Sequence, residues 1–178
     1  ALVVAALRGA FEYQGQKCSA ASRMYIPKSI WKEFKEKYVA EVKKIKMGDV
    51  EDFTNFMGAV IDKGAFDSIT DYIKFAKSSK EAEIITGGNF DDSKGYFIEP
   101  TTIVTTNPKF KTMEEEIFGP VMTMYVYDDN KLDETLTLCD ETSPYALTGA
   151  IWAQDRKAIV KMSNRLRNTA GNFYINDK

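Results

Sequence analysis

The chain has 178 residues, of which 44% are hydrophobic and 28% are charged, and its formal net charge is −2. This length allows one domain with a substantial core, and the composition is typical of a globular protein. The small net charge gives no reason to expect nucleic acid as a partner, and no apolar run approaches the roughly 18 residues of a membrane helix. The chain contains no histidine, which excludes Ser-His-Asp and Cys-His catalysis within it and any metal site that needs histidine.

Hydrophobic periodicity and turn-forming residues divide the chain into alternating helices and strands. Gly15 is the candidate C-cap of the first helix, and Ser29 and Asp155 are candidate N-caps of two later helices. The expected elements, in chain order, are a helix over residues 2–14, a strand over 22–26, helices over 29–44 and 62–76, strands over 84–85, 101–105 and 121–127, a helix over 129–138, a strand over 147–152, a helix over 155–166 and a strand over 170–175.

This alternation predicts an α/β fold with three layers, in which an open, twisted and mostly parallel sheet has helices on both faces. We expect one domain over residues 1–178, because the chain has no internal repeat, no low-complexity segment and no long linker. The chain starts without methionine inside a helix-like run and stops directly after a strand-like segment. We therefore expect a domain excised from a longer protein.

The most informative segment is FEYQGQKCSA, residues 11–20, which places Cys18 in a polar turn just after the first helical run. Reactive nucleophiles are usually displayed on such loops, held by rigid elements on both sides. Composition alone favours a buried and inert thiol, because cysteine is among the most buried residue types. The other cysteine, Cys139, ends a helical pattern and is expected to do no chemistry. The low cysteine count favours a reducing compartment.

Four segments resemble, in the same order, motifs of the aldehyde dehydrogenase superfamily. Residues 15–20, GQKCSA, resemble its nucleophile signature, and residues 95–101, GYFIEPT, resemble a strand lead-in of its catalytic domain. Residues 115–121, EEIFGPV, resemble its cofactor-contact motif, and residues 171–178, GNFYINDK, resemble the strand that leads to its substrate anchor loop. The resemblance implies that the chain is the nucleophile-bearing catalytic domain. The NAD-binding domain and the anchor loop would then lie outside the chain, which has no G-x-G-x-x-G fingerprint.

The residues around two of these motifs are most similar to one branch of the superfamily. That branch oxidises glutamate γ-semialdehyde, which is in equilibrium with Δ1-pyrroline-5-carboxylate, to glutamate in proline catabolism. The resemblance implies NAD as the cofactor, a small-molecule substrate and a parent protein that forms a homo-oligomer, a dimer or larger. It implies the mitochondrial matrix if the source is a eukaryote and the cytoplasm otherwise. Neither nucleic acid nor a membrane is expected as a partner.

The resemblance also implies roles for individual residues. Cys18 would attack the aldehyde, and the resulting thioester would be hydrolysed by water after hydride transfer. Ser19 would contact the substrate carboxylate and Lys17 could orient it, although a solvated lysine is an equal alternative for Lys17. Glu116 would accept hydrogen bonds from the nicotinamide ribose, and Phe118 would pack beside the ring. Without the motif, Glu116 belongs to a solvated acidic run and Phe118 is a core anchor.

Two other functions remain open from the sequence: oxidation of a different aldehyde, and a non-catalytic binding or structural domain of the same fold. The general base, the second oxyanion donor and the residues for the adenosine half of NAD would lie outside the chain. Ordinary cysteine is only a few per cent thiolate at neutral pH. We therefore expect the isolated domain to bind NAD weakly, to be inactive, and to carry a thiol that reacts slowly until the site is assembled.

Overall fold

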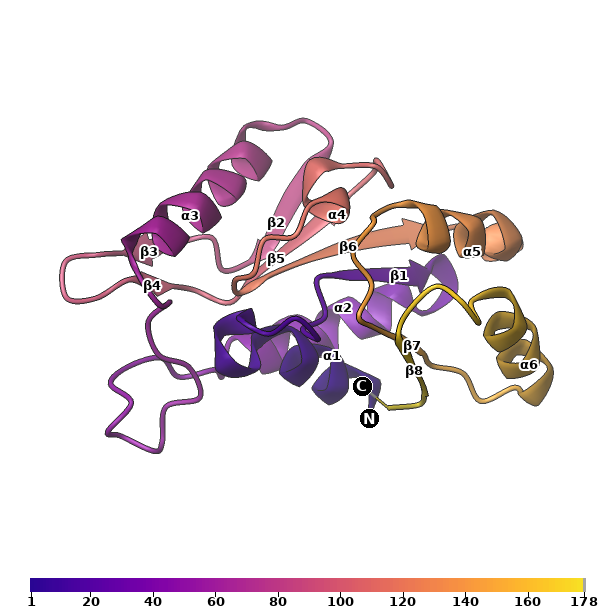
Figure 1. Cartoon of the computed structure of the whole chain (residues 1–178), viewed down its shortest axis with the longest axis horizontal. Coiled ribbons are helices and arrows are strands. Elements are labelled where there is room, and N and C mark those ends of the chain that lie inside the picture. The colour runs from indigo at the N-terminus through magenta and orange to yellow at the C-terminus, as the bar shows by residue number, and fades with distance from the viewer. Residues whose placement is uncertain (178) are drawn as a thin grey trace.

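The computed structural model describes residues 1–177; Lys178, the last residue of the GNFYINDK segment, lies outside the described residues. A four-stranded sheet with the order β1-β6-β5-β2 forms the centre of the fold (Figure 1). The elements are α1 (Leu2–Phe11), η1 (Glu12–Gly15), β1 (Arg23–Pro27), α2 (Lys28–Val42), α3 (Lys63–Ser78), β2 (Ala82–Thr86), β3 (Phe90–Asp91), β4 (Phe97–Ile98), β5 (Thr101–Thr105), α4 (Lys111–Glu114), β6 (Val121–Tyr127), η2 (Asp129–Lys131), α5 (Leu132–Glu141), β7 (Thr148–Ile151), α6 (Arg156–Arg165) and β8 (Asn172–Ile175).

Strands β1, β6 and β5 are parallel, and β2 pairs antiparallel to β5 at one edge of the sheet. In register, Tyr125 of β6 lies opposite Tyr25 of β1 and opposite Thr105 of β5. Because side chains alternate along a strand, neighbours on β6 serve opposite faces. Val121 belongs to the core under α3 and α4, whereas Met122 belongs to the core under α1 and α2. The result is the expected α/β arrangement of a mostly parallel sheet between two helical layers.

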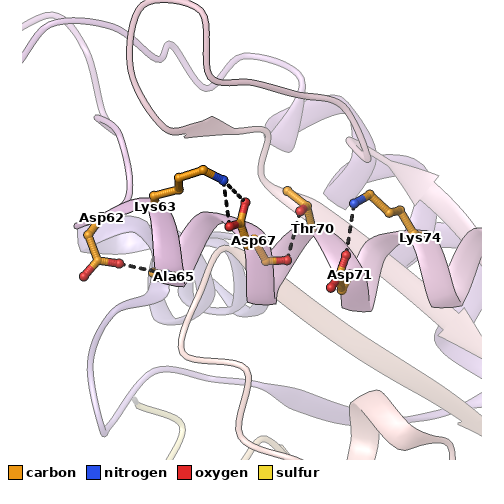
Figure 2. A network of polar contacts seen from close by, with 7 residues as sticks. All are labelled: Asp62, Lys63, Ala65, Asp67, Thr70, Asp71 and Lys74. Atoms are coloured by element: carbon orange, nitrogen blue, oxygen red, sulfur yellow. Dashed lines mark hydrogen bonds and ion pairs between the residues drawn. The ribbon is translucent and has the colours of Figure 1, made fainter.

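The solvent side of α3 shows how local charges support a surface helix (Figure 2). Asp62 is the N-cap and accepts the N–H of Ala65 at 2.8 Å, which satisfies one of the helix's unpaired donors. Two ion pairs at helical spacing follow along the same helix, Lys63–Asp67 at 2.7 Å and Lys74–Asp71 at 3.0 Å. Exposed pairs of this kind each contribute only a few tenths of a kcal/mol. The helix is therefore held mainly by its buried face, which includes Ile73.

A smaller unit lies at the C-terminal end of the described chain. Strands β7 and β8 form a parallel pair, and α5 and α6 pack around a third, small core. Three polar contacts join this unit to the main sheet and to the loop after α1: the Tyr25 hydroxyl donates to Thr142 Oγ1 at 2.9 Å, Arg23 to the Tyr145 carbonyl at 3.3 Å, and Thr148 Oγ1 to the Ser19 carbonyl at 3.2 Å.

The first helix is shorter than the sequence predicts. α1 ends at Phe11 rather than near Gln14, because Tyr13 and Gln14 adopt left-handed conformations with φ of 55° and 57°. Gly15 has the positive φ of a cap, 65°, but it closes the short η1 turn and not α1. Apolar spacing could not reveal this turn, because Gln14 is anchored by Ala59, which lies 45 residues away.

One of the two predicted N-caps is wrong and the other is confirmed. Pro27 is the N-cap of α2, and Ser29 lies in the first turn, where its N–H donates to Asp129 Oδ2 at 3.0 Å. The hydrogen bonds from Ser29 lower the pKa of Asp129. The Asp129 carboxylate therefore caps the start of α2, where no side chain of the helix does so. An anion is also favourable at a helix N-terminus. Asp155 caps α6 as predicted and accepts two backbone N–H groups at 3.2 and 3.1 Å.

Candidate active site

One backbone hydrogen bond closes the turn that carries Cys18, and a second ties the end of this turn to α1. The N–H of Ala20 donates to the carbonyl of Lys17 at 3.0 Å, and the N–H of Ala21 donates to the carbonyl of Gly9 in α1 at 2.9 Å. Cys18 and Ser19 occupy the two central positions of this turn, and both are exposed. Within residues 1–177, no hydrogen bond uses the Cys18 N–H. The turn therefore presents a thiol, a hydroxyl and a backbone donor together.

The segment before the turn packs directly on the predicted cofactor segment. A Cβ added at Gly15 would lie 2.3 Å from the carbonyl oxygen of Gly119, which is shorter than the contacts that real Cβ atoms make. Gly15 also has φ of 65°, which glycine adopts without the strain that other residues incur. Glycine at this position thus allows the nucleophile loop and the 115–119 segment to touch through their backbones.

Buried neighbours orient the 115–119 segment. The side chain of Ile117 is buried in the core under α3, which leaves the residues on either side of it, Glu116 and Phe118, exposed. Glu115 is held separately, because the Tyr72 hydroxyl donates to its carboxylate at 2.5 Å. This hydrogen bond raises the pKa of Tyr72 to about 12. Within the acidic run, Glu115 is thus engaged by α3, and Glu116 makes no such contact with that helix.

One cleft of about 810 Å³ brings the predicted site residues together. The thiol turn, α1 and β1 form one side of it, together with the 115–119 segment, and the smaller C-terminal unit forms the other. All five residues singled out from the sequence line it: Lys17, Cys18, Ser19, Glu116 and Phe118. Phe118 is 46% exposed and its backbone has φ of 55°, so this residue is not the core anchor that was the alternative.

The structure gives Lys17 a partner that the sequence analysis did not identify. Its ammonium lies 3.1 Å from Glu12 Oε2, and the other oxygen of that carboxylate accepts from Arg8 at 2.5 Å. The side chain of Lys17 is 33% exposed, so the pair is shielded only in part. Lys17 is therefore neither a freely solvated lysine nor an unpaired cation. The helical spacing of Arg8 and Glu12 indicates only their own ion pair, whereas Glu12 and Lys17 meet because the η1 turn lies between them.

The second cysteine lies in the same cleft, on the side of α5. Burial raises the pKa of the Cys139 thiol, which keeps it protonated and makes it a poor nucleophile at neutral pH. Cys18 is thus the more accessible of the two thiols. Residues 1–177 contain no cluster of cysteine and carboxylate side chains that could hold a metal ion, and none of their helices is long and apolar enough to cross a bilayer.

Comparison with known sequences relates the whole chain to one family. The family model described as "Aldehyde dehydrogenase family" matches residues 1–178. A Dictyostelium discoideum protein named mitochondrial delta-1-pyrroline-5-carboxylate dehydrogenase is 60% identical over 97% of this chain, and a Homo sapiens protein of the same name is 49% identical over 99%. The chain spans 31% and 32% of the lengths of these two relatives.

Solved structures give the same relation. The delta-pyrroline-5-carboxylate dehydrogenase of Mycobacterium tuberculosis, crystallised with NAD, matches with a TM-score of 0.92 and 43% identity over 99% of this chain and 32% of its own. The betaine aldehyde dehydrogenase of Staphylococcus aureus, in complex with NAD+, matches with a TM-score of 0.88 and 34% identity over 98% of this chain and 34% of its own. With a fold, a thiol turn and a family match that all agree, this chain belongs to the aldehyde dehydrogenase family.

Proposed function

We propose that residues 1–178 are the nucleophile-bearing catalytic domain of an NAD-dependent enzyme that oxidises L-glutamate γ-semialdehyde to L-glutamate. The observation that carries the proposal is the exposed thiol of Cys18 in the same cleft as Glu116 and Phe118. The names of the relatives support the substrate, because proteins 60% and 49% identical to this chain are named delta-1-pyrroline-5-carboxylate dehydrogenases. The semialdehyde is the open form of that cyclic compound, and proline catabolism would supply it.

In this reaction the thiolate of Cys18 attacks the aldehyde carbon and forms a thiohemiacetal. NAD, when bound, would accept the hydride that leaves this carbon. The carbon is then a thioester, and a water molecule cleaves its C–S bond to release the carboxylate and regenerate the thiol. The Cys18 N–H is available to the oxygen on which negative charge develops during attack. The second donor and the base that activates water would come from the rest of the parent protein.

The residues opposite the thiol have the chemistry that a nicotinamide riboside requires. The carboxylate of Glu116 is exposed and can accept hydrogen bonds from both hydroxyls of a ribose. The exposed ring of Phe118 offers a flat apolar surface for an aromatic ring. Backbone contact between Gly15 and Gly119 keeps this surface next to the thiol loop. No residue of this chain is assigned to the adenosine half.

We assign the recognition of the substrate's own carboxylate to the residues beside the thiol. Ser19 has an exposed hydroxyl in the turn and can donate to that carboxylate. Lys17 contributes a positive charge that is reduced by its pairing with Glu12, so we assign it an orienting role at a distance. The anchor loop of the parent protein would complete the binding site, and the isolated chain is proposed to be inactive.

For the parent protein we propose a homo-oligomer, a dimer or larger. We place it in the mitochondrial matrix if the source is eukaryotic and in the cytoplasm otherwise. Several relatives, including those of Dictyostelium discoideum and Homo sapiens, carry the word mitochondrial in their names. Sedimentation of the parent protein tests the first statement, and its distribution among cell fractions tests the second.

The decisive experiment measures NAD reduction by the parent protein with Δ1-pyrroline-5-carboxylate and with a panel of simple aldehydes that includes betaine aldehyde. The Cys18→Ala variant is measured beside it. We expect turnover that is selective for Δ1-pyrroline-5-carboxylate and abolished in the variant. Turnover with other aldehydes only would refute the substrate, and turnover that survives in the variant would refute the nucleophile. Absence of turnover with every compound would favour a non-catalytic domain of this fold.

A further inference from the structure

We infer that Gln14 and Gln16 are positioning residues, which hold the Cys18 turn in place by binding a distant backbone segment. The inference rests on the proposed role of Cys18 as the nucleophile. Gln14 and Gln16 stand four and two residues before the thiol, and their side-chain amides both bind the segment of residues 58–61. Neither amide was assigned a role from the sequence.

Gln14 uses both ends of its amide. Its Nε2 donates to the carbonyl of Ala59 at 3.0 Å, and its Oε1 accepts the N–H of Gly58 at 3.3 Å. The side chain thus pairs with a backbone donor and a backbone acceptor on two adjacent residues, Gly58 and Ala59. A glutamate at this position would keep the acceptor and lose the donor, and its charge would face the Ala59 carbonyl. Asparagine is one methylene shorter. Glutamine therefore suits both partners.

Gln16 provides a second attachment two residues later. Its Oε1 accepts the N–H of Ile61 at 2.8 Å. The two glutamines lie on either side of Gly15, whose backbone rests on Gly119. The loop before the thiol is thus held on one side by the 58–61 segment and on the other by the proposed cofactor segment.

The segment that the glutamines bind is itself well anchored. Met57 is 2% exposed and packs in the core under α1 and α2, whereas Val60 is 4% exposed and packs in the core under α3. The N–H of Val60 also donates to the carbonyl of Tyr96 at 2.9 Å. A segment fixed in both cores provides a rigid reference point for the loop.

The loop needs such an attachment because its backbone conformation is unfavourable in the absence of tertiary contacts. Tyr13 and Gln14 are two consecutive non-glycine residues whose backbones are left-handed. Residues with a side chain adopt this conformation only when their surroundings impose it. Tyr13 is 66% exposed, and its side chain makes no hydrogen bond within the described residues. The backbone hydrogen bond from Gln16 N–H to the Tyr13 carbonyl at 3.1 Å closes this stretch, and the two glutamine amides tie it to the 58–61 segment. The direction in which the chain enters the Cys18 turn is therefore assigned to these amides.

The test uses the parent protein with Gln14→Glu, Gln14→Ala and Gln16→Ala. The matched control is Tyr13→Ala, which truncates the neighbouring left-handed residue and leaves both amides intact. We expect kcat with Δ1-pyrroline-5-carboxylate to fall about 10- to 100-fold in the Gln14 variants, since a nucleophile displaced by about 1 Å loses rate on this scale. KM should change less than kcat. The control should remain within about twofold of the parent protein.

A second measurement requires no substrate. Hydrogen exchange of a peptide covering residues 12–21 should become faster in the Gln14 variants and not in the control, while a peptide from α3 is unchanged. Unchanged exchange in residues 12–21 together with parental kcat would overturn the inference. A lower thermal midpoint with neither change would assign the glutamines a purely structural role, which also overturns it. If the parent protein does not oxidise Δ1-pyrroline-5-carboxylate, the proposed substrate fails, and the exchange measurement still decides whether the amides hold the turn.

Discussion

Replacement of Gly15 by alanine should destabilise the chain strongly, because this glycine is required for two independent reasons. Its φ of 65° is left-handed, which costs a residue with a side chain about 1–2 kcal/mol. In addition, the new Cβ would lie 2.3 Å from the Gly119 oxygen and 2.8 Å from the Ala10 oxygen, and both obstacles are backbone atoms. Overpacking against atoms that cannot rotate away costs about 1–3 kcal/mol. The expected loss in the free energy of unfolding is therefore about 2–5 kcal/mol.

Gly64→Ala is the matched control, because the same substitution should there have the opposite effect. Gly64 lies in the first turn of α3, and its added Cβ would meet nothing closer than Asp62 Oδ1 at 3.4 Å, an ordinary contact. Alanine is favoured over glycine in a helix by up to about 1 kcal/mol. Equilibrium urea unfolding of the two variants, followed by tryptophan fluorescence, measures both changes.

The two variants also separate stability from geometry. An ordinary surface substitution changes the free energy of unfolding by at most about 0.5 kcal/mol. If the Gly15 variant differs from the unsubstituted chain by no more than this, the contact with Gly119 is not what the structure indicates. In the parent enzyme, Gly15→Ala should reduce turnover as well, because relief of the clash must displace either the thiol loop or the segment of Phe118. Full activity in a Gly15→Ala enzyme would contradict the close approach of these two segments.

Three further predictions concern the scaffold. Asp155→Ala should lower the free energy of unfolding by about 0.5–2 kcal/mol through loss of the α6 cap, measured by urea unfolding. Thr123→Val should cost about 1–3 kcal/mol, because it leaves the buried Thr112 hydroxyl without its 2.7 Å partner, and valine at both positions should recover part of the loss. The hydrogen bond to Glu115 raises the pKa of Tyr72 from about 10 to about 12, so its stabilising effect is complete below pH 10 and is lost as the pH rises through about 12. Tyr72→Phe should accordingly flatten the stability profile in this window, and an unchanged profile would contradict the assignment.

Much of the fold follows from short-range patterns in the sequence. The strands over residues 101–105 and 121–127 are observed with the predicted bounds, because β-branched and aromatic residues are concentrated there between clear turn residues. The short elements β3, β4 and α4 were not predicted, and η2 is a separate 3₁₀ turn at the start of the helix predicted over residues 129–138. Elements of two to four residues are too short for periodicity to show, and they form where the packing of longer elements requires them.

The candidate site, too, was predicted in part: its chemical residues were identified from the sequence, and the contacts that hold them were not. Cys18, Glu116 and Phe118 were identified from motifs, and the structure places them along one cleft. The contacts of Gln14 and of Tyr72 could not be inferred, because their partners lie tens of residues away in the chain. Ser29 was misassigned for the same reason, since Asp129 satisfies the start of α2 from another element. Sequence patterns reveal which residues carry chemistry, whereas tertiary contacts decide which residues hold them.

The two sides of the cleft rest on cores of unequal size. The thiol turn is attached to the two large cores of the main sheet, whereas the facing unit contains only three buried apolar side chains among the described residues, Leu136, Ile151 and Leu166. Segments with few buried contacts open at a lower free energy than the rest of a protein. In this chain, thermal fluctuations should therefore change the width of the cleft more than the position of the thiol. A bulky or slowly leaving molecule would be accommodated by movement of the smaller C-terminal unit. The nucleophile would keep its position relative to the segment of Phe118.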